Sequence, residues 1–149
     1  FAVRNSGATA VVEGTSDHLA EYMTGGVVAV LGDTGRNVAA GMTGGVLFLY
    51  DIDHRVKGRM ADSAPKLERL GSTDAELLLR IVREHHRRTG SPRAEDILDH
   101  WNTRADRFWV LRPEPPAGSG PRVGTASDSE HRTGVVVGDA TDLREHLAG

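Results

Sequence analysis

The sequence predicts a mainly β protein, in which a parallel β-solenoid with turns of about 19 residues is followed by two α-helices. Three observations lead to this fold class. A glycine-containing motif repeats at a fixed interval, and each copy is followed by a short apolar run of strand length. The apolar period then changes from strand to helix after Thr73.

The repeat is the strongest of these signals. The motif Met-Thr-Gly-Gly-Val occupies residues 23–27 and recurs at residues 42–46, 19 residues later. One step further back, a glycine column continues as Gly7, Gly26 and Gly45. Repeats of this kind are typical of solenoids, because a unit that cannot bury its own apolar face stacks on its neighbours.

Apolar runs follow the three glycines, at residues 8–12, 27–31 and 46–50. Stacking these runs about 4.8 Å apart would form a ladder of backbone hydrogen bonds. Like residues would then lie above one another, with Val11, Val30 and Leu49 in one column. We expect glycines at the corners of the coil, where a Cβ would be costly. The candidate corner residues are Gly7, Gly25, Gly26, Gly41, Gly44 and Gly45.

A first helix is predicted at residues 74–89, because Thr73 and Glu76 form a capping box and Gly90 ends the apolar pattern. The apolar stripe of this helix consists of Leu78, Ile81, Val82 and His85. A second helix is predicted to begin at Ser91 and Pro92, an N-cap followed by a proline in the first turn. Its apolar side chains are Ala94, Ile97, Leu98 and Trp101.

The chain divides into three predicted regions. Residues 1–62 form β-helix turns that are truncated at the N-terminus, and residues 63–112 form a helical segment that packs on the solenoid. Residues 113–149 begin with a stretch rich in proline and glycine and are predicted to be a flexible tail. Within this tail, residues 135–137 are predicted to add a strand and residues 142–147 a turn of helix.

Composition excludes several functional classes. The chain has no cysteine, which removes disulfides, thiolate metal sites and cysteine nucleophiles together. Its net charge of −3 favours neither nucleic acid nor an anionic membrane as a partner. No apolar run approaches the roughly 20 residues that span a bilayer. We therefore expect a cytoplasmic protein with no nucleic-acid and no membrane partner.

No segment meets the requirements of a catalytic, cofactor or metal site. The glycine-rich residues 32–37 lack the Lys-Ser/Thr pair of a phosphate-binding loop, and residues 51–54 match no calcium or zinc spacing. His85 and His86 are adjacent on a helix and point in different directions, so they do not share one ion. We expect turns, a solvated loop and a packing histidine at these places. Glu21 and Tyr22, just before the first repeated motif, fit either a partner contact or a local cap.

Several of these stretches occur together in one known family. The stretches that agree in order with it are residues 1–8, 12–14, 17–18, 21–26, 31–32, 34–37 and 39–45, and then residues 85, 89–91, 94–101 and 108. Over about residues 1–112, the chain resembles the C-terminal domain of the glutamate synthase large subunit.

The resemblance implies a right-handed parallel β-helix that is a non-catalytic scaffold. In the family, an amidotransferase domain releases ammonia from glutamine, and an FMN and iron–sulfur domain combines the ammonia with 2-oxoglutarate. The resemblance places FMN and the cluster in those other domains and none in this chain. Its partners would be the other domains of the large subunit and the small subunit, with Glu21, Tyr22, Arg36 and Asn37 as candidate contact residues. One alternative is a free-standing solenoid subunit that docks on separately encoded oxidoreductase subunits. A second alternative is a small independent enzyme that binds a phosphorylated ligand at the glycine corners.

Overall fold

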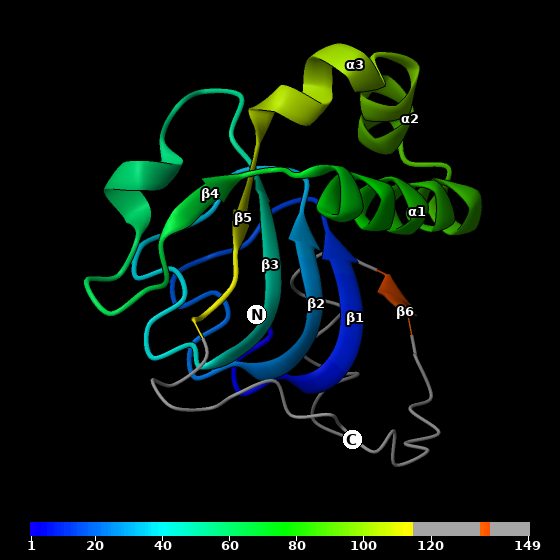
Figure 1. The fold of residues 1–149 in the computed structure, drawn as a ribbon. Coiled ribbons are helices and arrows are strands. Elements are labelled where there is room, and N and C mark those ends of the chain that lie inside the picture. Colours follow the sequence, from blue (N-terminus) through cyan, green and yellow to red (C-terminus); the bar gives the residue numbers. More distant parts are fainter. Residues whose placement is uncertain (115–134, 138–149) are drawn as a thin grey trace.

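The structure, a computed structural model, describes residues 1–114 and 135–137. One six-stranded sheet forms its centre, in the order β4-β5-β3-β2-β1-β6 (Figure 1). Strands β1, β2, β3 and β6 run parallel, and β5 pairs antiparallel with both β3 and β4. The strands are β1 (Ser6–Val12), β2 (Thr24–Val30), β3 (Gly44–Tyr50), β4 (Leu67–Arg69), β5 (Phe108–Leu111) and β6 (Val135–Val137).

Helices cover one face of this sheet and loops cover the other. The helical elements are η1 (Val56–Arg59), α1 (Ser72–Thr89), α2 (Pro92–Asp99), α3 (Trp101–Arg104) and η2 (Ala105–Arg107). On the helix side, Phe48 of β3 packs with Leu78 and Val82 of α1 and with Ile97 of α2. On the other side, the loops between the parallel strands bury their own apolar residues, such as Leu19 and Val38, against the sheet. The chain is therefore layered as loops, sheet and helices.

The fold class expected from the repeat is wrong: the chain is a mixed α/β domain and not a parallel β-helix. A β-helix would need strands on further sides of each turn, but the segments that join β1, β2 and β3 are loops without strands in the described structure. Residues after β3 then add antiparallel strands β4 and β5 to the same sheet and place helices on its face. The repeat indicated that strands lie side by side, but it did not determine what covers them.

The predicted column of Val11, Val30 and Leu49 is wrong in its first member. Val30 pairs with Leu49, but β1 places Val12 beside Val30 and Val11 beside Ala29. The register of β1 shifts between Ser6 and Thr9. Because successive strand residues point to opposite faces, this slip of one residue turns Val11 to the helix side.

The loops between the parallel strands stack on one another through backbone hydrogen bonds. The Ala20 amide donates to the Phe1 carbonyl at 2.9 Å, and the Ala39 amide donates to the Leu19 carbonyl at 2.8 Å. Ala2, Ala20 and Ala39 share the left-handed conformation, with φ of 55°, 55° and 60°. Successive loops thus repeat the same backbone path, which explains why the sequence repeats beyond its strands.

The helices follow their predicted periodicity closely, while their first boundary differs. The buried residues of α1 are the predicted stripe Leu78, Ile81, Val82 and His85, and Gly90 ends the helix with φ of 65°. The predicted capping box is wrong, because α1 begins at Ser72 and makes no side-chain cap bond. Ser91 caps α2 as predicted by accepting a hydrogen bond from the Ala94 amide at 3.1 Å.

Residues 135–137 form the strand that was predicted there, paired with β1. The predicted flexibility of the tail falls largely on residues 115–134 and 138–149, and the predicted turn of helix falls on residues 142–147. These segments lie outside the described residues. Among the described helices, none combines the length and the apolar character that crossing a membrane requires.

Candidate functional site

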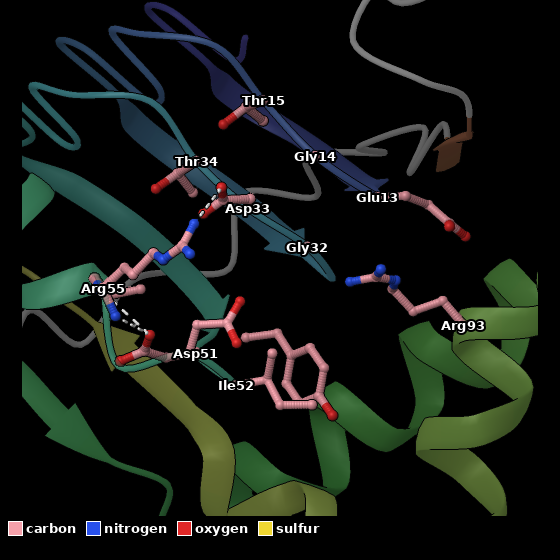
Figure 2. Close-up of a pocket in the computed structure, with 13 residues that line it drawn as sticks. Glu13, Gly14, Thr15, Gly32, Asp33, Thr34, Asp51, Ile52, Arg55 and Arg93 are labelled. Atoms are coloured by element: carbon pink, nitrogen blue, oxygen red, sulfur yellow. Dashed lines mark hydrogen bonds and ion pairs between the residues drawn. The ribbon is translucent and has the colours of Figure 1, made fainter.

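A cleft lies at the carboxyl ends of the three parallel strands β1, β2 and β3 (Figure 2). Open α/β sheets bind ligands at this edge, because loops that leave neighbouring strands converge there. The cleft encloses about 660 Å³. We call it the carboxyl-end cleft. Its lining residues are Glu13, Gly14, Thr15, Gly32, Asp33, Thr34, Tyr50, Asp51, Ile52, Asp53, Arg55, Val56 and Arg93.

Glu13, the first residue after β1, joins the sheet to both main helices. Its carboxylate accepts a hydrogen bond from the Ser91 hydroxyl, and its Oε1 lies 3.0 Å from Nε2 of His85. His85 is only 2% exposed and belongs to α1, whereas Ser91 is the N-cap of α2. Glu13 therefore holds two helices at the end of one strand.

The environment of Glu13 favours its ionised form. Partial burial acts to raise the pKa of the carboxyl, but the hydrogen bonds from Ser91 and His85 and the charge of Arg93 outweigh it. The net result is a pKa below the ordinary value of 4.5. An ionised Glu13 is an acceptor only, which suits its position between a hydroxyl and an imidazole.

The order of these three groups does not form a hydrolytic triad. In a triad, the histidine lies between the serine and the carboxylate and takes the serine proton. Here the carboxylate lies between Ser91 and His85, and the Ser91 oxygen also accepts from the Ala94 amide. The arrangement ties both helices to the residue that follows β1.

Asp51, the first residue after β3, has both carboxylate oxygens occupied. Oδ1 accepts hydrogen bonds from the backbone amides of Arg55 at 2.8 Å and Val56 at 3.3 Å. Oδ2 accepts from the indole Nε1 of Trp109 at 2.9 Å. The side chain is only 7% exposed, so the solvated loop expected at residues 51–54 begins with a buried anchor.

Charged groups at the mouth of the carboxyl-end cleft are paired with each other. Asp33, after β2, lies 3.6 Å from the guanidinium nitrogens of both Arg55 and Arg59, as Figure 2 shows for Arg55. Arg93 of α2 extends toward the strand ends and donates from Nη1 to the Leu31 carbonyl at 3.0 Å. These contacts connect the loops after β2 and β3 and tie α2 to β2.

Three buried hydroxyl oxygens that line the cleft, those of Thr15, Thr34 and Tyr50, have no hydrogen-bond partner in the described structure. Thr34 is 4% exposed and Tyr50 is 5% exposed, and neither hydroxyl oxygen is paired. Burial acts to raise the pKa of Tyr50, and the net shift is upward. Unpaired hydroxyls and a cleft of this size are the features of the site that could receive a small polar group.

The described residues contain no group of three or more potential metal ligands. The whole chain also lacks cysteine, so it offers no thiolate to an iron–sulfur cluster. The residues of this chain therefore do not fit an iron–sulfur cluster.

The six glycines predicted as corners fall into three groups, and glycine is required in only two of them. Gly26, Gly41 and Gly45 have φ of 88°, 63° and 85°, which side chains rarely adopt. Gly25 and Gly44 lie where the neighbouring strand passes closely, so that a Cβ would collide with the backbone of Ser6 or Thr24. Gly7 has open space around it and no positive φ.

The candidate contact residues lie on two neighbouring loops. The Tyr22 amide donates to the Ala40 carbonyl at 2.8 Å, and the carboxylate of Glu21 lies 3.1 Å from Nδ1 of His18. In the next loop, the Arg36 amide donates to Oδ1 of Asp17 at 2.7 Å. The Asn37 backbone has a φ of 56°. The structure thus brings Glu21, Tyr22, Arg36 and Asn37 onto the loop side of the molecule, outside the carboxyl-end cleft.

Sequence reasoning missed the connections that build the cleft. Glu13 with His85, and Asp51 with Trp109, are far apart in the chain and carry no local motif. The available signals were indirect: His85 falls on an apolar stripe, and Glu13 and Asp51 each follow a strand.

The fold and the site define a small α/β domain of stacked glycine-rich loops, in which most of the charged groups of the cleft hold the domain's own elements together. The chain belongs to the GXGXG motif family, which matches it over residues 1–114.

Its curated relatives are glutamate synthases. The chain is 45% identical over 118 residues to the ferredoxin-dependent glutamate synthase of Pyropia yezoensis, which covers 78% of this chain and 8% of that protein. It is 40% identical over 149 residues to ferredoxin-dependent glutamate synthase 2, chloroplastic, of Arabidopsis thaliana, covering 99% of this chain and 9% of the relative. It is 44% identical over 115 residues to the glutamate synthase [NADPH] large chain of Azospirillum brasilense, covering 76% and 8%. The chain thus spans less than a tenth of the length of these relatives.

Proposed function

We propose that the chain is a non-catalytic structural domain of a glutamate synthase, which converts glutamine and 2-oxoglutarate to glutamate. In this role it holds the amidotransferase domain and the FMN domain in their working arrangement. The observation that carries the proposal is the likeness to glutamate synthases at 40–45% identity. In the proposal, FMN and the iron–sulfur cluster belong to the other domains.

The chemistry of the carboxyl-end cleft supports a structural role. Glu13, Asp51 and Arg93 use their polar atoms to join strands, helices and loops of this chain. A catalytic acid or base needs a free atom within reach of its substrate. Groups that bond to their own fold in this way are suited to rigidity.

The loop side supports a role in docking. Tyr22 is 54% exposed and Val3 is 50% exposed, although both are large apolar side chains. Tyr22 has a φ of 56°, and an added Cβ at Gly41 would lie 2.6 Å from its ring. The stacked loops hold this exposed ring in place, and such pre-organisation lowers the entropic cost of binding a partner. Aromatic and arginine side chains on rigid loops are common anchors of protein interfaces.

The test replaces the matching segment of the Azospirillum brasilense large chain with residues 1–114 of this chain. We expect the chimera to form glutamate from glutamine and 2-oxoglutarate. Adding Tyr22→Ala and Arg36→Ala should lower this coupled activity about tenfold, the effect of losing roughly 1.4 kcal/mol of interface energy.

The readouts separate a scaffold from a catalytic part. Glutaminase activity, and glutamate formation from added ammonia, should stay near the level of the parent chimera, because the catalytic domains are intact. Arg88→Ala, an exposed change on α1, is the matched control. Loss of glutaminase activity in the folded double variant, or coupled activity equal to that of the control, would refute the docking role.

A further inference from the structure

A second hollow lies on the helix side of the sheet, between α1 and the middle of β1 and β2. It encloses about 950 Å³. Its floor is apolar and includes Val27, Leu77 and Ile81, and its rim carries Arg80, Arg83 and Arg87 of α1. We call it the α1 groove.

The α1 groove exists because α1 covers only part of its face of the sheet. Val11, Ala29 and Phe48 are fully buried beneath the helices. One step back along the same face, Thr9 and Val27 pair with each other and remain only partly buried. The pair Thr9 and Val27 therefore remains partly accessible to solvent beside the amphipathic helix α1.

The rim of the α1 groove is basic. Three arginines line it together with one carboxylate, Glu84. Glu84 is hydrogen-bonded to the guanidinium groups of Arg87 and Arg88, at 2.6–2.9 Å. A suitable occupant therefore presents apolar side chains to the floor and acidic ones to the rim.

Strand β6 brings a segment of this chain to that place. β6 runs parallel to β1, with Val137 beside Val11, and lies in contact with α1. The chain therefore leaves β6 next to the row that borders the α1 groove, as the position of β6 beside β1 and α1 in Figure 1 indicates.

The sequence after β6 has the complementary chemistry. Residues 138–149 contain three acidic residues and one arginine. Ala140, Leu143 and Leu147 follow an i, i+3, i+7 spacing, which gives one apolar stripe on a helix. Twelve residues remain after Val137, enough to reach along α1.

We propose that residues 138–149 dock in the α1 groove, with Leu143 and Leu147 on its apolar floor and the acidic side chains facing its arginines. In this contact the occupant of the α1 groove is a segment of the chain itself. It is independent of the role proposed for the loop side.

Because the chain has no native cysteine, two introduced cysteines can form a disulfide only with each other. The full chain carries Glu84→Cys in the α1 groove and Arg144→Cys in the segment, and it is exposed to a mild oxidant at several protein concentrations. The matched control has the same cysteines together with Leu143→Ser and Leu147→Ser, which leave the charge unchanged. We expect the intramolecular disulfide to form about tenfold faster in the first protein, because docking raises the effective concentration of the two thiols.

The rate and the products of disulfide formation show whether the α1 groove holds residues 138–149 of the same chain or a second copy of the chain. A faster monomeric disulfide that slows toward the control rate in high salt supports the proposal, since salt screens the charge contacts. Equal rates in the two proteins would overturn it, and so would disulfide-linked dimers that grow with concentration, which place a second copy there. Should Glu84→Cys prevent folding, Arg83→Cys with Arg144→Cys repeats the same measurement.

Discussion

Asp51 illustrates how one residue can anchor several elements. Three N–H groups, from Arg55, Val56 and Trp109, point to its two oxygens. The Trp109 ring also lies under the Arg69 guanidinium, 3.7 Å from its centroid. The sequence predicted a solvated loop here, because nothing local indicates that the indole lies beside this aspartate.

Asp51→Asn should destabilise the chain by about 1–3 kcal/mol, the cost of leaving a buried polar group without a partner. An amide has one acceptor oxygen, so one of the three donors would face an NH₂ group. Urea unfolding followed by tryptophan fluorescence measures the change. Asp53→Asn, an exposed change two residues away, is the control, and an equal effect of the two substitutions would contradict the anchoring role.

Gly26 and Gly7 form a natural pair for testing the glycine column. Gly26→Ala should cost about 1–3 kcal/mol, because its φ of 88° is strained for any side chain and a Cβ would lie 2.7 Å from Nδ2 of Asn5. Gly7→Ala should change the unfolding free energy little, since nothing lies within 4 Å of the added atom. Thermal unfolding of the two variants distinguishes them. Similar melting temperatures would show that the left-handed corner is not required.

At the scale of elements, the apolar period predicted the helices well. The stripe of α1 was predicted residue by residue, because a helix that packs on a sheet must present one continuous apolar face. The first residue of α1 was not predicted correctly, because Gly71 occupies the N-cap position and makes no side-chain hydrogen bond there. The hydrogen bonds of Glu13 with His85 and Ser91, which join the helices to the sheet, also could not be predicted from any local sequence pattern.

The contact of Glu13 with both helices predicts a pH dependence of stability. The folded pKa of Glu13 lies below its ordinary value of 4.5, so its contribution is fully present above that value. This contribution is lost as the pH falls through the lower folded pKa. The difference in unfolding free energy between the native chain and Glu13→Gln should therefore shrink from about pH 6 to about pH 3.

Urea unfolding at each pH measures this difference. Glu95→Gln, an exposed change on α2, is the matched control. A Glu13→Gln effect that is constant over the whole range would rule out the ionised carboxylate as its source. His85, Ser91 and Arg93 are the groups that act on Glu13, so they remain unchanged in every variant.

At the scale of the whole molecule, the sheet is completed by strands that are distant in sequence. β6 covers the edge of β1, and β5 covers the edge of β3. An uncovered strand edge is a template for pairing with another chain.

Val136→Pro should therefore cause self-association that grows with protein concentration. Proline removes an amide donor from β6, at the residue that pairs with Ala10. Light scattering coupled to size-exclusion chromatography measures the mass. Ala126→Pro, which lies outside β6, is the control. A variant that remains at the native mass at all concentrations would show that β6 does not protect this edge.

Patterns within a few residues were enough to locate the strands of the repeat, the two main helices and the short strand at residues 135–137. They were enough because apolar periodicity and glycine spacing report how each segment meets its nearest neighbours. The order of the sheet, the one-residue shift of β1 and the pairing of Glu13 and Asp51 with distant partners came from the folded molecule alone. Each of these depends on contacts between segments far apart in the chain, whose free energy is shared among many residues and leaves no local signature. The repeat therefore predicted that strands stack, while the antiparallel pairing of β5 with β3 and β4 makes one mixed sheet, and the helices cover one face of it.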